Sequence, residues 1–368
     1  MRRKATWFQR FVLPGFAFKA VVIGGGYATG RELATFFLPS GPQGGVLAML
    51  ATTSIWSVVC CLTFLFAFET KSLDYCTFFR QLLGPCWPIF EIAYVLSLIV
   101  IAAVFAAAAG AIGRALFGLP QIAGTLALVM GIALIAAWGN EAVERLFKYV
   151  TIFLYGTYAI FVILDLSKFG DQTIAALQAD VPMTNWAMGG ATYAGYNILG
   201  AVVVLPALRH LTCRRDAAIS GLLAGPMAIA PALLFFVCMC GFYPQIKDET
   251  LPSDYMLARL DAPGFRVMFE MMVLAALLES GTGGLHAVNE RIAQAWGKPL
   301  SAAARFLIAA IILAGSVFFA ARFGLVSLVA SGYRWISYAI LAIYVAPLMT
   351  LGLARVMFLQ TSQRVPEA

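Results

Sequence analysis

An interrupted apolar run near the N-terminus decides the fold of this sequence. The run extends over Phe11–Leu38 and contains the stretch Gly24-Gly25-Gly26-Tyr27-Ala28-Thr29-Gly30-Arg31-Glu32. It is long enough for an α-helix to cross the roughly 30 Å of hydrocarbon in a bilayer, which takes about 20 residues. Glycines weaken a helix, and adjacent charges are costly inside a membrane. We therefore expect a membrane helix that is broken near its centre.

The composition of the chain also indicates a membrane protein. Of its 368 residues, 61% are hydrophobic and 12% are charged, whereas about a quarter are charged in soluble domains. Apolar runs recur along the chain without the period-2 alternation of barrel strands, which favours helices. Basic residues lie between these runs, so the net charge of +7 indicates cytoplasmic loops and not a nucleic-acid surface. We predict an all-α membrane protein with one transmembrane domain, residues 1–368.

Ten apolar segments give the predicted membrane helices. They are Phe11–Leu38, Val46–Phe68, Pro88–Ile112, Ile122–Trp138, Tyr149–Leu166, Trp186–Leu208, Ala217–Phe242, Phe265–His286, Ala302–Ala321 and Leu325–Leu353. With the N-terminus inside, the inner segments contain sixteen Lys and Arg residues and the outer ones six, as the positive-inside rule requires. We predict a multi-pass protein of the cell (inner) membrane with both termini in the cytoplasm. The longest polar connection, 241–264, is expected to contain a short surface helix, Tyr255–Leu260.

The cysteine and histidine content argues against metal and enzyme sites. The seven cysteines include no CxxC pair, and only His210 and His286 could join them in a zinc site. We expect buried, unpaired thiols. The sequence contains no HExxH motif and no Ser-His arrangement, so we predict that the chain is not an enzyme. The basic N-terminus is not followed by a cleavage site, which makes the first apolar run a retained helix.

A second glycine-rich stretch, Gly189–Gly200, lies in the middle of the sixth segment. The first and sixth segments are equivalent if the chain consists of two five-helix halves, at about 11–166 and 186–353. Five is odd, so the second half would enter the membrane from the opposite side. Interrupted helices at matching places in inverted halves indicate a transport site near the bilayer midplane. The alternative is that the glycines only allow close helix packing.

The residues quoted so far resemble a known family. The run Gly24–Glu32, the pair Gly44-Gly45 that opens the second helix and the pair Phe68-Glu69 that closes it are similar to the start of LeuT-fold transporters. These proteins form the amino acid–polyamine–organocation superfamily and its sodium-symporter relatives, and the sequence most resembles the YkvI-type membrane proteins among them. The resemblance implies a 5+5 inverted repeat with helices one and six interrupted. It also implies a secondary transporter that moves a small organic solute, amino-acid-like, by alternating access coupled to sodium or protons. The alternative is a non-transporting nutrient receptor on the same fold.

A broken helix also supplies binding groups of its own. Carbonyls are exposed where one half ends and N–H groups where the other begins, which suits a zwitterionic amino acid. Tyrosines beside the breaks would supply walls and hydrogen bonds, unless they serve helix packing alone. The expected substrate-binding residues are Gly24, Gly25, Gly26, Tyr27, Ala28, Thr29, Gly30, Tyr193, Tyr196 and Asn197.

The resemblance implies a coupling-ion site between helices one and eight. In sodium-coupled relatives, a small residue and two hydroxyls on helix eight bind the ion together with carbonyls of helix one. The matching positions here are Ala276, Glu279 and Ser280, with Gly24 and Tyr27 on helix one. Glu279 replaces a hydroxyl, so it could strengthen a cation site, replace it with a protonation site, or pair with a membrane arginine. Na⁺ or H⁺ is the only cofactor expected.

The remaining charged residues are expected to form a gate. Relatives close the outer side with an Arg on helix one and an acid on helix ten, whereas this chain offers Arg31, Glu32 and Arg334. The pairs Arg31–Glu279 and Glu32–Arg334 are one possible arrangement among several. Glu69 is expected to bind loop backbone or the inner half of helix six. The expected partners are a small-molecule solute and the lipid bilayer, with no nucleic acid, and the oligomeric state stays open.

Overall fold

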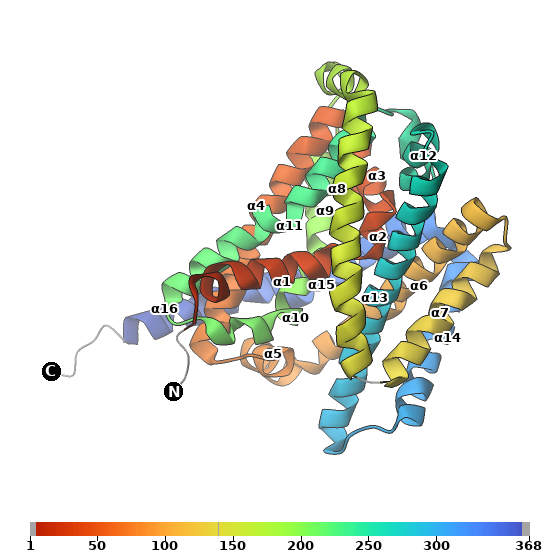
Figure 1. The fold of residues 1–368 in the computed structure, drawn as a ribbon. Coiled ribbons are helices and arrows are strands. Elements are labelled where there is room, and N and C mark those ends of the chain that lie inside the picture. Colours follow the sequence, from red (N-terminus) through yellow and green to blue (C-terminus); the bar gives the residue numbers. More distant parts are fainter. Residues whose placement is uncertain (1–4, 139, 363–368) are drawn as a thin grey trace.

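The computed structural model describes residues 5–138 and 140–362, which are helical apart from turns and short connections (Figure 1). The N-terminal half comprises η1 (Phe8–Val12), α1 (Leu13–Val22), α2 (Gly25–Ala28), α3 (Arg31–Phe36), η2 (Leu38–Ser40), α4 (Gly41–Thr70), α5 (Tyr75–Leu83), η3 (Gly84–Cys86), α6 (Pro88–Phe117), α7 (Gln121–Trp138) and α8 (Asn140–Gln178). The C-terminal half comprises α9 (Trp186–Asn197), α10 (Gly200–Val203), η4 (Leu205–His210), α11 (Arg214–Cys240), η5 (Gln245–Asp248), α12 (Pro252–Arg259), α13 (Pro263–Trp296), α14 (Ala302–Ser327), η6 (Leu328–Gly332), α15 (Tyr333–Ile340), η7 (Leu341–Val345), η8 (Leu348–Gly352) and α16 (Leu353–Ser362). These ranges contain no strand, and the predicted all-α membrane fold is confirmed.

The ten predicted apolar segments all fall on helices of the structure. Among the described residues, six helical stretches are long and apolar enough to cross a membrane. The last of them, Ala302–Phe358, contains a kink at Gly324 (φ 70°, ψ 170°), and therefore holds the ninth and tenth predicted segments. The fourth segment is the shorter apolar helix Gln121–Ala137. The first and sixth segments are divided into short pieces, as expected for interrupted helices.

The helices pack in two groups around the broken ones. On one side α11 lies along α4 and α1, and on the other α6, α7 and α14 pack together, with α8 and α13 between the groups (Figure 1). The short α2 contacts α13 and α6, while α9 lies between α4 and α15. Both breaks therefore lie inside the bundle, where neighbouring helices and not lipid surround the interrupted backbone, as the bilayer requires.

Three helical features differ from the predicted segments. The helix α8 continues past the predicted end at Leu166 to Gln178. The helix α5 lies in the connection after α4, and Asp74 caps it by accepting a hydrogen bond from the Thr77 N–H (2.8 Å). The helix α12 confirms that the 241–264 connection contains a short helix, but the expectation that this helix lies on the surface was wrong. Met256 and Leu257 are buried because α12 packs against α3 and α13.

The seven cysteines are unpaired, as predicted, but they are not all buried. The buried ones are Cys60, Cys76, Cys238 and Cys240. Cys86 and Cys213 are exposed because they lie in connections, Cys86 in η3 and Cys213 directly before α11. The expectation of buried thiols therefore holds for four cysteines within helices, holds in part for Cys61 of α4, and is wrong for the two in connections.

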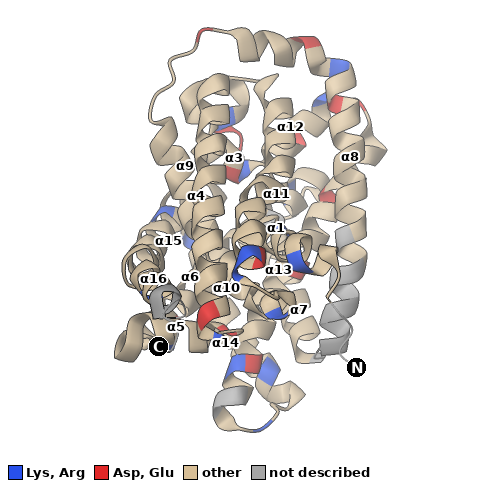
Figure 2. Cartoon of the chain, turned by 90° about the vertical axis from the view of Figure 1, so that its left-hand side faces the viewer, with Lys and Arg blue, Asp and Glu red and all other residues tan. Residues whose placement is uncertain are grey.

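Both described ends of the chain lie at the same end of the bundle. Arg10 of η1 forms an ion pair with Asp216 near the start of α11 (2.7 Å), and Arg355 of α16 donates to the carbonyl of Gln81 in α5 (2.8 Å). The start of α11 and α5 both adjoin the end of α4, where Glu69 pairs with the first residue of α11 (3.1 Å). Figure 2 marks the Lys and Arg positions in blue, and they occur towards both ends of the bundle. The assignment of either end to the cytoplasm stays a prediction.

Candidate functional site

The first membrane helix is broken twice. The helix α1 ends at Val22, and Gly24 is extended (φ −91°, ψ 179°) before the single turn of α2. A second break follows at Gly30, whose φ of +75° belongs to the left-handed region that favours glycine. Thr29 holds this turn together, since its Oγ1 donates to the Gly26 carbonyl (2.8 Å) and accepts from the Arg31 N–H (3.2 Å).

Glu32 lies where the two broken helices meet. Its side chain is only 4% exposed, and its Oε2 accepts a hydrogen bond from the Tyr196 hydroxyl of α9 (2.5 Å). A Cβ added to Gly26 would overlap Glu32 Oε1, so this oxygen lies directly against the backbone of α2. The turn at Gly30 folds α3 back far enough to bring the carboxylate to α2. Glu32 therefore lies at the centre of the site, although the sequence assigned it to a gate.

Tyrosines enclose this carboxylate. Tyr27, Tyr193, Tyr196 and Tyr333 are all buried, and the Tyr196 and Tyr333 rings are 4.4 Å apart between centroids. Tyr193 packs edge-on against Tyr196 at 5.6 Å. Tyr27 lies further from Tyr196 and stacks on Tyr158 of α8 at 5.8 Å. The structure thus brings three of these tyrosines from α9 and α15 around Glu32 and places Tyr27 on the α8 side.

On α9 and α15, two hydroxyl groups are buried without a hydrogen-bond partner among the described residues. They are the hydroxyls of Tyr193 in α9 and Ser337 in α15. A buried hydroxyl without a partner costs free energy, and such groups in native structures commonly face a ligand or water. The sequence reasoning missed Tyr333 and Ser337. The available signal was their spacing, because Tyr333, Ile336, Ser337 and Ile340 form one buried helical face with two polar members.

The sixth helix breaks closer to its C-terminal side than the glycine pattern indicates. The α-helix α9 ends at Asn197, and turns at Ile198 and Leu199 lead into α10. Gly195 lies within α9, where an added Cβ would overlap Ser337 Oγ. Gly190 likewise lies against the Ala48 carbonyl of α4. These two glycines serve close packing, whereas the break itself lies at Ile198 and Leu199, within the predicted stretch Gly189–Gly200.

Asn197 is turned towards its own helix. Its Nδ2 donates to the Tyr193 carbonyl (3.1 Å), and its side chain is partly exposed. This contact closes the last turn of α9, where carbonyls lack intrahelical partners. A role of Asn197 in substrate binding stays a prediction, as do the roles of Gly25, Ala28 and Thr29.

The predicted coupling-ion residues are partly brought together. Gly24 lies beside Ser280, because a Cβ added to Gly24 would be 3.3 Å from Ser280 Oγ. Ala276 is buried on the same helix, α13, which packs against α2. Glu279 is partly buried and lies within electrostatic reach of Tyr155 in α8. The contact of Gly24 with Ser280 is the geometry that an ion site between helices one and eight requires, and its use for coupling stays a prediction.

Arg31 binds backbone carbonyls and not a carboxylate. Its Nη1 donates to the carbonyls of Lys247 (3.1 Å) and Glu249 (2.6 Å) in the connection before α12, and its Nε donates to Thr35 Oγ1 (3.1 Å). Neither pair of the arrangement Arg31–Glu279 and Glu32–Arg334 is formed in this structure. The physical reason is that Arg31 points out of the bundle towards the connection while Glu32 points inward.

The connection before α13 closes over the same end of the first helix. Ser253 of α12 donates its N–H to the Thr29 carbonyl (3.0 Å) and its Oγ to Glu270 of α13 (3.2 Å). Glu270 is completely buried. Arg334 of α15, the third predicted gate residue, has an exposed side chain. Arg31, Thr29 and Ser253 therefore seal this side, and a gate function for Arg334 stays a prediction.

The opposite end of the first helix is held by ion pairs. Arg10 Nε and Nη2 donate to both carboxylate oxygens of Asp216 (2.8 and 2.7 Å), which also accepts from Thr212. Glu69 pairs with Arg214 of α11 (3.1 Å), so the expectation that it binds loop backbone or helix six was wrong. Glu69 binds Arg214 instead because the guanidinium group at the start of α11 offers a positive charge.

The donor groups of the site do not resemble those of a metal centre. The described residues hold no cluster of three or more His, Cys, Asp or Glu side chains that could bind a metal ion. Glu32 is surrounded by tyrosines, and a carboxylate with phenol neighbours suits an organic cation better than a transition metal.

No family model and no curated protein matches this sequence. Solved structures do match its fold. MhsT in complex with L-phenylalanine has a TM-score of 0.65 at 14% identity and covers 97% of this chain and 98% of its own. A manganese transporter of Eremococcus coleocola, bound to an aromatic bis-isothiourea substituted compound, has a TM-score of 0.60 at 12% identity, covering 93% and 78%. Mhp1 in an inward-facing conformation has a TM-score of 0.60 at 12% identity, covering 91% and 76%. The chain has the all-helical membrane fold of the LeuT-fold transporters.

Proposed function

We propose that this chain is a secondary active transporter of a small, amino-acid-like solute that carries an amine, and that transport is coupled to Na⁺ or H⁺. The observation that carries the proposal is the buried carboxylate of Glu32 at the meeting point of the broken helices. A carboxylate at this depth is costly unless a cation or hydrogen-bond donors compensate it. Its Oε2 accepts a hydrogen bond from the Tyr196 hydroxyl, and its Oε1 lies against the backbone of Gly26. A solute ammonium group would supply the missing charge.

The surroundings of Glu32 support a solute with a polar and an apolar part. The unpartnered hydroxyls of Tyr193 and Ser337 offer hydrogen bonds to the polar part. The faces of Tyr196 and Tyr333 offer apolar and cation–π contact. MhsT, which shares the fold, is seen with L-phenylalanine, and that complex is compatible with such a solute.

The fold and the sequence motif support the same class of function. Neighbours with this fold include a manganese transporter, but the described residues offer no comparable cluster of metal ligands. An organic solute is therefore favoured over a divalent metal. We also propose that the chain belongs to the amino acid–polyamine–organocation superfamily, close to YkvI-type proteins, on the strength of the motif Gly24–Glu32 and the pair Gly44-Gly45.

Coupling is proposed to act through α2 and α13. The contact of Gly24 with Ser280 favours sodium bound by backbone and hydroxyl oxygens. Glu279 beside Ser280, or Glu32 itself, favours a proton, since a carboxylate in the membrane can carry one. The two ions make different predictions for Glu279→Gln. Loss of sodium dependence would assign the site to sodium, and loss of pH dependence alone would assign it to protons.

Uptake into proteoliposomes tests the proposal. Wild-type protein is screened with amino acids and amines while sodium and proton gradients are imposed separately. We expect accumulation of at least one amine solute against its gradient, and a loss of about tenfold or more in Glu32→Gln, because a charged hydrogen bond is removed. Asp171→Asn on the exposed surface of α8 is the control and should transport like the wild type.

Three outcomes separate the possibilities. Binding of a solute without accumulation would favour the nutrient-receptor alternative. Wild-type accumulation by Glu32→Gln would remove Glu32 from the solute site while leaving transport in place. Glu32→Asp, which keeps the charge but shortens the side chain, should fall between the wild type and Glu32→Gln if position and charge both matter.

A further inference from the structure

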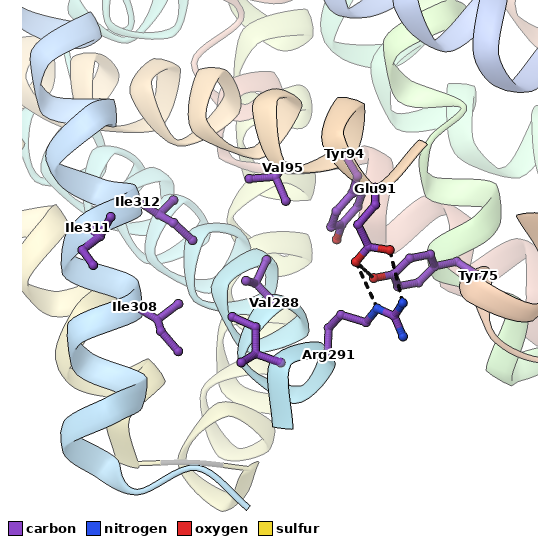
Figure 3. Close-up of a pocket in the computed structure, with 10 residues that line it drawn as sticks. Tyr75, Glu91, Tyr94, Val95, Val288, Arg291, Ile308, Ile311 and Ile312 are labelled. Atoms are coloured by element: carbon purple, nitrogen blue, oxygen red, sulfur yellow. Dashed lines mark hydrogen bonds and ion pairs between the residues drawn. The ribbon is translucent and has the colours of Figure 1, made fainter. Parts of the chain in front are cut away.

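A cavity of about 300 Å³ lies between α6, α13 and α14, away from the broken helices. Val95 of α6, Val288 and Ile292 of α13, and Ile308, Ile311 and Ile312 of α14 line most of it. Its walls are almost entirely apolar. Figure 3 shows the isoleucines and valines on one side and a polar group at the other end, where Tyr75, Glu91, Tyr94 and Arg291 gather.

The polar end of the cavity is built around Arg291. Its Nε and Nη2 donate to Glu91 (3.0 and 3.3 Å), and its Nη2 also contacts Cys76 Sγ (3.2 Å). The Tyr75 hydroxyl donates to the same carboxylate (3.0 Å), as Figure 3 shows. These hydrogen bonds, within the described part of the chain, leave the Nη1 group of Arg291 for a further acceptor.

A second guanidinium group stands next to this end. Arg80 of α5 stacks on the Trp87 ring (4.7 Å from Cζ to the centroid), and Arg291 lies 5.6 Å from the same ring. Two cations and the single carboxylate of Glu91 leave a net positive charge. Trp, Tyr and Arg are the residues that membrane proteins place at the level of the lipid headgroups. The polar end of the cavity therefore has the composition of a membrane interface.

The apolar part of the cavity opens onto the surface that the bilayer covers. Ile311 lines the cavity and is nevertheless 66% exposed. On α6 and α14, Ile92 (63%) and Leu307 (61%) also expose large apolar side chains, although neither lines the cavity. Exposed apolar side chains on membrane-spanning helices face acyl chains. The cavity thus runs from the headgroup level into the hydrocarbon region along one leaflet.

We propose that this cavity binds one anionic phospholipid, with an acyl chain between α6, α13 and α14 and the phosphodiester at Arg80 and Arg291. The charge at the polar end fits a phosphate, and guanidinium groups bind phosphate oxygens well. The apolar walls fit an acyl chain, which a soluble anion lacks. The lipid would fill the space between α13, which carries Ala276–Ser280, and α14.

Photo-crosslinking of the wild-type protein tests the site without a mutation. The probes are phosphatidylglycerol and phosphatidylcholine with a diazirine in one acyl chain, in otherwise identical vesicles. We expect phosphatidylglycerol to label α6, α13 and α14 around Val95, Val288 and Ile308 more than the exposed face of α7. Equal labelling of all lipid-facing helices, or equal labelling by phosphatidylcholine, would overturn the proposal.

Two variants test the two ends of the cavity separately. Ile312→Trp fills the apolar part, and Leu307→Trp on the exposed face of the same helix is its matched control. We expect about tenfold less labelling in Ile312→Trp, because a cavity filled by the Trp side chain could admit an acyl chain only by overpacking. We expect no change of labelling in Leu307→Trp. Arg80→Gln, on the exposed side of α5, should lower labelling about fivefold through the loss of one charged contact.

The controls distinguish a lipid from its headgroup alone. Glycerol phosphate and inorganic phosphate are added at increasing concentration to the crosslinking reaction. Displacement of phosphatidylglycerol by either anion would mean a phosphate site without an acyl-chain requirement, and would contradict the proposal. Unchanged labelling in Ile312→Trp, with that variant folded by its thermal transition, would do the same.

Discussion

The two broken helices interrupt their backbones by different means. The first needs a residue at positive φ, Gly30, and places a charged side chain, Glu32, beside the break. The sixth turns at Ile198 (φ −63°) and Leu199 (φ −52°) without any such residue, and Gly190 and Gly195 serve its packing. Both glycine-rich stretches therefore contain a break, but only in the first does a glycine at positive φ make it. Substitutions of the glycines separate these two uses.

Gly30→Ala should have the largest effect. An Ala at φ +75° costs about 1–2 kcal/mol of strain, and its Cβ would lie 2.8 Å from the Phe235 ring. We expect solute uptake to fall by about tenfold or more, because α3 and Glu32 would shift. Gly118→Ala is the matched control, since Gly118 has φ +65° and no neighbour within 4 Å. Equal losses of uptake in both variants would mean that strain alone, and not the position of Gly30, limits transport.

Gly195→Ala should reduce stability before it reduces uptake. Its Cβ would overlap Ser337 Oγ and lie 3.3 Å from Leu341 Cγ, which is overpacking worth about 1–3 kcal/mol. Thermal unfolding in detergent measures the loss, and adding Ser337→Ala should restore part of it. Gly156→Ala in α8, where no atom lies within 4 Å, is the control. A hinge at Gly195 would instead show as lost uptake at unchanged stability, with no rescue by Ser337→Ala.

Gly200→Ala should have the smallest effect. The nearest atoms to its Cβ would be side-chain carbons of Val21 (3.1 Å) and Phe18 (3.3 Å), which can move by a few tenths of an ångström. We expect uptake within about twofold of the wild type, which corresponds to ~0.4 kcal/mol. A loss comparable with that of Gly30→Ala would show that the sixth helix, like the first, depends on glycine at its break.

Much of the fold could be predicted because hydrophobic length is a direct consequence of bilayer thickness. The ten apolar runs and the double-charged break at Arg31 and Glu32 needed no tertiary information. The place of Glu32 could not be predicted, since it depends on how far the turn at Gly30 rotates α3. The break at Ile198 lies within the predicted stretch Gly189–Gly200, but its exact residues could not be predicted because glycines that pack and glycines that bend look alike in sequence. The roles of Ser280 and Glu279 depend on an ion and stay predictions.

Arg31 binds the connection before α12 by donating hydrogen bonds to the main-chain oxygens of Lys247 and Glu249. Every residue type has the same backbone carbonyl, so these two hydrogen bonds do not depend on which side chains stand at positions 247 and 249. Substitutions of Lys247 and Glu249 should therefore leave these hydrogen bonds in place as long as the backbone keeps its shape. The requirement falls on Arg31, because one lysine ammonium cannot replace both the Nη1 group at the two carbonyls and the Nε group at Thr35. Substitution of Arg31 should therefore disturb this contact more than substitution of either residue whose carbonyl it binds.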